Sequence, residues 1–132
     1  MTTGTLIADQ PPRFTIAVVD DDRSILESLE RLLESADHAV RLFASGGALI
    51  ESECLAKVDC LISDIDMPAM DGFGLIRLVR AARPELPIIV ITGHPEMLSR
   101  SVAIGPGYYR YFTKPFKGPE LLMAVSEALR IA

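Results

Sequence analysis

The stretch LISDIDMPAMDG, residues 61–72, decides the fold class because it joins a buried strand to an acidic loop. A short apolar run ends abruptly at Asp64, and Asp66 and Asp71 follow shortly afterwards. Such a run, bounded by turn residues, is typical of a strand that is covered on both faces of a parallel sheet. Carboxylates placed directly behind it predict a functional loop at the edge of the core.

Further short apolar or β-branched runs have the same character. The run CLIS at 60–63 overlaps the stretch quoted above. The four further runs are FTIAVV at 14–19, AVRLF at 39–43, PIIVIT at 87–92 and YRYF at 109–112. Helical patterns lie between and after them, at 45–52, 72–82, 95–104, after the candidate N-cap Asp22 and after Gly118, where Pro119 suits a first helical turn. This alternation predicts an α/β fold: a doubly wound, five-stranded parallel sheet with helices on both faces.

Length and composition limit the classes of protein. The 132 residues, 49% of them hydrophobic, suffice for one compact domain, which we expect over 14–132 after a flexible tail over 1–13. The net charge of -5 argues against direct binding to nucleic acid, whose phosphates are held by clustered Lys and Arg. Neither a membrane-spanning stretch nor a signal peptide is recognisable, so we expect a cytoplasmic protein without a membrane partner.

The predicted strands end in polar residues that carry chemistry. They are Asp20, Asp21 and Asp22 after the first strand, Asp64 after the third, Thr92 at the fourth and Lys114 after the fifth. In an open α/β sheet the carboxyl ends of the strands form the ligand-binding edge. Clustered carboxylates repel one another unless a cation neutralises them, and an all-oxygen set suits a hard ion such as Mg²⁺. Hydroxyl and ammonium donors would hold phosphoryl oxygens, so the set predicts phosphoryl transfer to a carboxylate.

Four motifs together resemble the receiver domains of two-component response regulators. They are VVDDD at 18–22, ISDIDMPAMDG at 62–72, VITG at 90–93 and YFTKPF at 111–116. The resemblance extends from Phe14 to the C-terminus, and order and spacing match the FixJ-type receivers especially closely. It implies a (βα)5 fold of the flavodoxin and CheY type, and a signalling domain that promotes only its own phosphorylation and dephosphorylation.

The resemblance also implies a role for each residue of the acidic pocket. Asp64 would be the phosphoacceptor and a metal ligand, and Asp21 a direct carboxylate ligand. Asp20 would act largely through water, and the backbone carbonyl of Asp66 would complete the protein's ligands. The ion would be Mg²⁺, with Mn²⁺ as a substitute.

The remaining implied roles concern the switch and the partners. Lys114 would pair with the acceptor carboxylate, and Thr92 would donate its hydroxyl to a phosphoryl oxygen while Tyr111 rotates inward. We expect a cis peptide bond between Lys114 and Pro115. The phosphoryl donor would be a sensor histidine kinase or a histidine phosphotransfer protein. The output would be changed affinity for a downstream protein, or a homodimer through helix 4, strand 5 and helix 5.

Three departures from the family pattern stand out. Asp66 places a carboxylate where the second neighbour of the acceptor is often neutral or basic, and we hypothesise that it alters the phosphoryl lifetime. The stretch IGPGYYRYF at 104–112 predicts that the fourth helix ends near Ile104, which alters the standard dimer surface. The chain ends after its last receiver helix. A stand-alone receiver is our expectation, and the N-terminal part of a longer regulator is the alternative.

Two other functions remain open at this point. DIDM at 64–67 also resembles the nucleophile motif of haloacid-dehalogenase-type phosphatases, but that family places its paired acidic motif after the nucleophile, whereas Asp20 and Asp21 precede it here. A receiver that binds its partner regardless of phosphorylation is the second alternative. Phosphate release from a generic ester would favour the enzyme, and partner binding without phosphorylation would favour the constitutive module.

Overall fold

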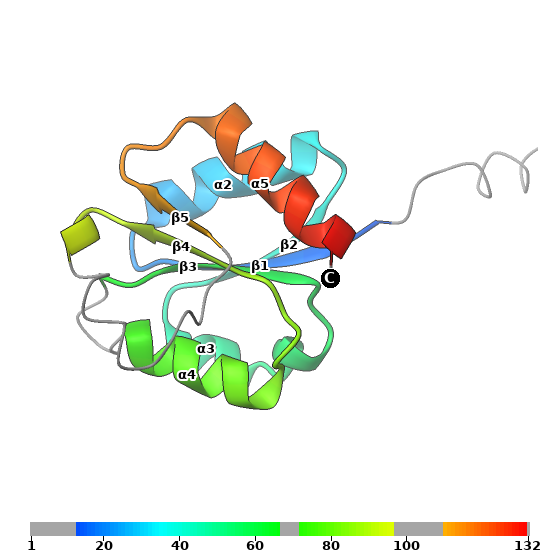
Figure 1. Ribbon diagram of the computed structural model, residues 1–132, viewed down its shortest axis with the longest axis vertical. Coiled ribbons are helices and arrows are strands. Elements are labelled where there is room, and N and C mark those ends of the chain that lie inside the picture. The colour runs from blue at the N-terminus through cyan, green and yellow to red at the C-terminus, as the bar shows by residue number, and fades with distance from the viewer. Residues whose placement is uncertain (1–12, 67–71, 97–109, 132) are drawn as a thin grey trace, which may run out of the picture.

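The computed structural model describes residues 13–66, 72–96 and 110–131, and its centre is a parallel sheet (Figure 1). The strands are β1 (Thr15–Val19), β2 (Ala39–Phe43), β3 (Cys60–Asp64), β4 (Ile88–Thr92) and β5 (Arg110–Thr113). Their order is β2-β1-β3-β4-β5, and every neighbouring pair is parallel. The predicted doubly wound, flavodoxin-type sheet is therefore confirmed.

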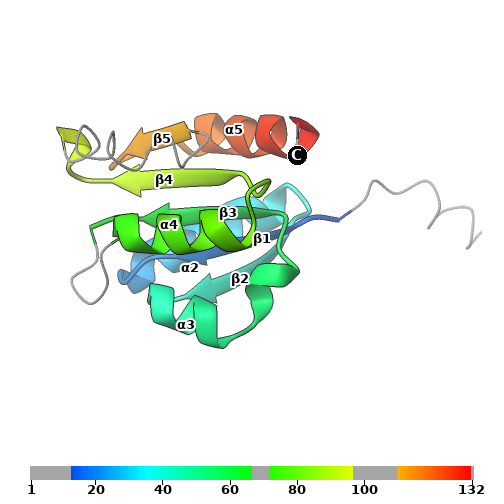
Figure 2. The same ribbon diagram turned by 60° about the horizontal axis from the view of Figure 1, so that its bottom comes forward.

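Helices cover both faces of this sheet. They are α2 (Arg23–Ser35), α3 (Gly46–Glu51), α4 (Gly72–Ala82) and α5 (Gly118–Ile131), with a short 3₁₀ helix at Cys54–Ala56 that the sequence did not predict. Figures 1 and 2 show α2 and α5 on one face and α3 and α4 on the other. Residues 1–12 of the predicted tail over 1–13 and most of the predicted helix over 95–104 lie outside the described residues, as does the stretch from Gly105 to Tyr108.

The two faces have separate cores because neighbouring residues of a strand point to opposite sides. In β1, Ala17 and Val19 pack towards α3 and α4, while Ile16 and Val18 pack towards α2 and α5. The strands β3 and β4 are buried along their whole lengths, which explains why their sequences are continuous apolar runs rather than alternating ones. These buried strands give the loops at their carboxyl ends a rigid base.

Local signals in the sequence explain where α2 begins and how the last loop is shaped. The side chain of Asp22 accepts a hydrogen bond from the backbone N–H of Ser24, so Asp22 is the predicted N-cap. The helix α5 begins at Gly118, one residue before Pro119, close to Leu32 of α2. The Lys114–Pro115 bond is cis, as expected.

Among the described residues, no helix has the length and apolar character that a membrane span requires.

Candidate functional site

The sheet brings the ends of four strands to a single edge. Asp64 is the last residue of β3, and Thr92 is the last residue of β4. Backbone hydrogen bonds continue beyond the strands: the N–H of Asp20 donates to the carbonyl of Phe43 at 3.1 Å, and that of Lys114 donates to the carbonyl of Thr92 at 2.8 Å. Main-chain bonds therefore fix the residues that carry the candidate chemistry.

Three of the aspartates hold the backbone two residues further along the chain. Asp20 Oδ1 accepts from the N–H of Asp22 at 2.8 Å, and Asp22 Oδ1 accepts from the N–H of Ser24 at 2.9 Å. Asp64 Oδ1 accepts from the N–H of Asp66 at 2.9 Å. Such turns are characteristic of aspartate. Because each uses only Oδ1, the Oδ2 atoms of Asp20 and Asp64 are left for other partners.

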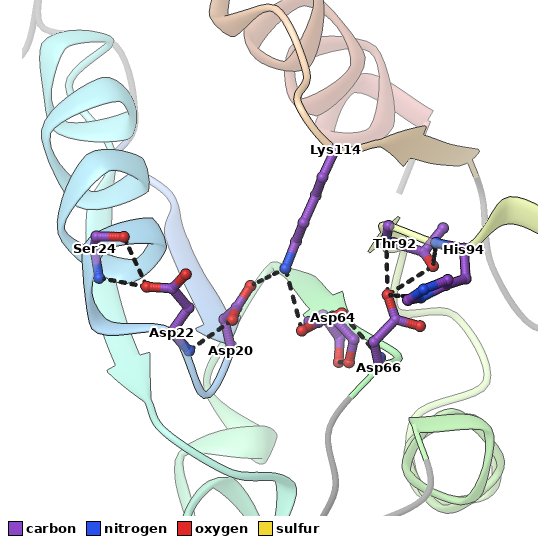
Figure 3. Close-up of polar contacts among 10 residues, drawn as sticks. Asp20, Asp22, Ser24, Asp64, Asp66, Thr92, His94 and Lys114 are labelled. Carbon is purple, nitrogen blue, oxygen red and sulfur yellow. Dashed lines mark hydrogen bonds and ion pairs between the residues drawn. The ribbon is translucent and has the colours of Figure 1, made fainter.

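Lys114 joins these two carboxylates across the site. Its Nζ donates to Asp20 Oδ2 at 3.0 Å and to Asp64 Oδ2 at 3.2 Å, as Figure 3 shows. Asp20 is fully buried, and Asp64 is 2% exposed. An ammonium group placed between two buried carboxylates balances part of their charge and keeps Asp64 in a defined position.

Asp20, Asp21 and Asp64 form a compact acidic cluster. One carboxylate oxygen from each lies within 4.8 Å of the others. Burial raises the pKa of Asp20, and the nearby charge of Asp64 adds to this, although hydrogen bonds from Asp22 and Lys114 act in the opposite direction. The ionised form is thus costly in this protein, and the cluster suits a hard cation, which would offset that cost.

Burial and the neighbouring carboxylates also have opposite effects on the pKa of Lys114. Burial on its own would lower the pKa of Lys114, but the hydrogen bonds and charges of Asp20 and Asp64 outweigh it, so the pKa is raised. Lys114 therefore stays protonated at neutral pH and can act as a permanent cation at this edge of the sheet.

Thr92 has a partner that the sequence did not indicate. Its hydroxyl donates to Asp66 Oδ2 at 2.9 Å, and the backbone N–H of Gly93 donates to the same oxygen at 2.7 Å. Thr92 Oγ1 also accepts from the N–H of His94, whose Nδ1 lies 3.6 Å from Asp66 Oδ2. Figure 3 shows Asp66 between Asp64 and this group of donors. We refer to Thr92 Oγ1 and the Gly93 N–H as the donor pair.

The structure thus brings most of the expected residues to one edge of the sheet. Asp20, Asp21 and Asp64 cluster, Lys114 bridges two of them, and Thr92 lies on the neighbouring strand. Tyr111 is on β5 with 47% of its surface exposed. Sequence reasoning missed the Gly93 amide because a backbone donor has no residue-type signal, and it gave His94 no role near Asp66.

Comparisons with known proteins agree with this geometry. The chain matches the family model of the response regulator receiver domain over residues 16–126. It is 36% identical over 117 residues to the response regulator protein TodT of Pseudomonas putida, covering 89% of this chain and 52% of that protein. The chain therefore spans about half the length of this curated relative.

Solved structures show the same fold. A CheY-like receiver domain from Methanospirillum hungatei JF-1 superimposes with a TM-score of 0.82 at 26% identity, covering 90% of this chain and 95% of that one. The receiver domain of DrrB activated with BeF3 gives a TM-score of 0.81 at 28% identity, with 90% and 99% covered. The match to the family model covers the sheet from Ile16 onward and includes the acidic cluster, and on that basis the chain belongs to the receiver domains of response regulators.

Proposed function

We propose that the chain accepts a phosphoryl group on Asp64 from the phosphohistidine of a sensor histidine kinase or a histidine phosphotransfer protein. The observation that carries this proposal is the Lys114 bridge, which holds a buried acceptor carboxylate beside a second carboxylate at the open edge of the sheet. The family assignment favours neither the phosphatase nor the constitutive module considered from the sequence. Because histidine kinases use ATP, the proposal places the exchange in the cytoplasm.

The residues of the acidic cluster fit a magnesium ion. Asp20, Asp21 and Asp64 would hold it with the backbone carbonyl of Asp66, and Mn²⁺ would be accepted as a substitute. Support comes from the three clustered carboxylate oxygens and from the raised pKa of Asp20, which reflects chiefly the cost of burying its carboxylate in the charged form. When bound, the ion supplies positive charge that offsets the charge on the phosphoryl oxygens.

The transfer is a displacement at phosphorus. A carboxylate oxygen of Asp64 forms the new P–O bond while the P–N bond to the histidine breaks, and the imidazole nitrogen keeps the electron pair. Lys114 holds the acceptor before transfer and balances a phosphoryl oxygen afterwards. Hydrolysis of the acyl phosphate by water then releases inorganic phosphate and restores the Asp64 carboxylate.

The output of this cycle is a change in protein binding. We propose that Thr92 donates to a phosphoryl oxygen and that Tyr111 turns inward, altering affinity for a downstream protein. A homodimer through the helix predicted over 95–104, β5 and α5 is one form that this output could take. Direct contact with nucleic acid is not part of the proposal, because the chain carries a net charge of -5.

Intact-protein mass measurement after incubation with acetyl phosphate and Mg²⁺ tests the proposal. We expect one added phosphoryl group in the wild type and none in Asp64→Asn. Asp22→Asn is the matched control. It removes a carboxylate from the same edge of the sheet, but that carboxylate accepts hydrogen bonds from Ser24 and belongs to the cap of α2. We expect this variant to be phosphorylated as the wild type is. The adduct should disappear when EDTA replaces Mg²⁺.

An adduct in Asp64→Asn would place the acceptor elsewhere. A wild type that remained unmodified by acetyl phosphate and by a panel of histidine kinases would overturn the phosphoacceptor role and favour the constitutive module.

A further inference from the structure

The hydroxyl of Thr92 is already engaged in this structure. A hydroxyl group has one proton to donate, and that of Thr92 goes to Asp66 Oδ2 at 2.9 Å while its oxygen accepts from the N–H of His94. The N–H of Gly93 is likewise used by Asp66 Oδ2, at 2.7 Å. A phosphoryl oxygen on Asp64 could therefore receive a hydrogen bond from this donor pair only after Asp66 has left it.

Asp66 satisfies the donor pair as a phosphoryl oxygen would. A carboxylate oxygen and a phosphoryl oxygen are both anionic acceptors that form charge-assisted hydrogen bonds with O–H and N–H groups. The backbone N–H of Asp66 donates to Asp64 Oδ1, so the competing carboxylate is attached directly beside the acceptor (Figure 3). No external ligand is needed to fill the donor pair.

This inward position of Asp66 is incompletely satisfied. Its Oδ1 is buried, and within the described residues it has no hydrogen-bond partner. A buried carboxylate oxygen without a partner raises the free energy of the conformation that buries it. The side chain as a whole is 17% exposed, so it lies next to solvent into which it can turn. The unpartnered Oδ1 therefore lowers the free energy needed to displace this side chain from the donor pair.

Resting on the proposed function, we propose that Asp66 is an internal competitor of the phosphoryl group for the donor pair. While it occupies Thr92 Oγ1 and the Gly93 N–H, neither donor is available to an oxygen on Asp64, and Tyr111 is half exposed on β5. Seating of the phosphoryl group expels the carboxylate and frees Thr92 to follow. Asp66 is thus a positioning residue. It acts through Thr92 and sets the free energy that is needed to seat a phosphoryl group at the donor pair.

The occupancy of the donor pair can be separated from simple charge repulsion by comparing Asp66→Ala with Asp66→Asn. Both variants remove the negative charge, but the asparagine carbonyl can still accept from Thr92 and Gly93, whereas alanine leaves both donors without this acceptor. Competition predicts that alanine relieves the inhibition more than asparagine. Repulsion alone predicts equal effects. Glu51→Ala, at the exposed end of α3, controls for net charge.

The measurement is the dissociation constant for beryllofluoride, a phosphoryl analogue, by calorimetric titration in saturating Mg²⁺. We expect Asp66→Ala to bind about tenfold more tightly than wild type, which corresponds to roughly one charge-assisted hydrogen bond. Asp66→Asn should gain about threefold or less, since a neutral acceptor competes more weakly. In a Thr92→Val background the gain from Asp66→Ala should fall to about threefold, because only the Gly93 amide is then released.

A second readout does not depend on phosphorylation. In ¹H–¹⁵N spectra of the ligand-free proteins, the Gly93 amide should move upfield in Asp66→Ala and stay close to its wild-type position in Asp66→Asn and Glu51→Ala. Equal beryllofluoride affinities in the wild type and Asp66→Ala would overturn the competition and leave the phosphoacceptor role intact. Failure of every protein to bind beryllofluoride would overturn the proposed phosphoacceptor function and the competition with it.

Discussion

Lys114 Nζ lies 3.0 Å from Asp20 Oδ2, closer than the 3.2 Å that separates it from Asp64 Oδ2. The two residues are 94 positions apart in the sequence, and Asp20 is fully buried. Without this ammonium, Asp20 would face a second carboxylate in a poorly solvated position. The lysine therefore has a structural role in the resting protein in addition to its proposed role with the phosphoryl group.

Replacing Lys114 by methionine should lower the free energy of unfolding in EDTA by about 2 kcal/mol, because it removes two charge-assisted hydrogen bonds from buried carboxylates. Urea denaturation monitored by circular dichroism gives this value. Lys117→Met is the matched control: Lys117 is exposed, and its loss should change stability by less than about 0.5 kcal/mol. Equal stabilities of wild type and Lys114→Met would contradict a structural role for the bridge.

Magnesium should stabilise the wild type, by about 2.7 kcal/mol at a hundredfold excess over its dissociation constant. In Asp20→Asn this stabilisation should fall by more than half, because one member of the acidic cluster is lost. Asp22→Asn, whose side chain can still cap α2, should retain the full effect. The measurement is the urea midpoint with and without Mg²⁺. If Asp20→Asn gained as much stability as wild type, Asp20 would not belong to the ion's surroundings.

The same variant has an expected effect without the ion. Burial raises the pKa of Asp20 above its unfolded value, so folding favours the protonated form. The contribution of the protonated Asp20 carboxyl to the stability of the fold is present below the unfolded pKa and is lost as the pH rises through the folded pKa. At pH 7 in EDTA, Asp20→Asn should therefore be at least as stable as the wild type, and a clear loss of stability would show that the carboxylate contributes more than it costs.

The sequence predicted the architecture because the fold follows from patterns along the chain. Continuous apolar runs identified β3 and β4, and the aspartates and Lys114 were placed correctly because parallel strands end at one edge. The contact between Thr92 and Asp66 could not be predicted in this way. It depends on the side-chain rotamer of Asp66 and on a main-chain N–H at Gly93, and neither leaves a signature in residue types or spacing.

His38 should make the stability of the protein depend on pH below about 6.5, its ordinary pKa. Burial lowers the pKa of His38, although the charge of Asp37 opposes this, and the ring lies 6.4 Å from that of Phe14 between centroids. The unfolded chain therefore binds a proton more readily than the folded one. The contribution of the neutral His38 ring to stability is complete above the unfolded pKa and declines as the pH falls towards the folded pKa.

Urea midpoints at pH 7.5 and 5.5 check the role of His38. The wild type should lose more stability between these values than His38→Gln, which has no titrating ring. Because the other acidic groups are common to both proteins, their contributions cancel in the comparison. Identical losses would mean that the histidine is equally easy to protonate in the folded and unfolded chains.

Tyr111 should become less exposed when Asp64 carries a phosphoryl analogue. It is 47% exposed on β5, and in the proposed switch it moves inward as Thr92 is drawn towards the phosphoryl group. In protein labelled with 3-fluorotyrosine, the fluorine signal of Tyr111, assigned with Tyr111→Phe, should show a smaller H₂O-to-D₂O solvent shift after beryllofluoride and Mg²⁺ are added. Thr92→Val should bind the analogue and leave that solvent shift unchanged. An undiminished solvent shift in the wild type at saturation would mean that Tyr111 has a packing role and that the signal leaves the pocket by another route.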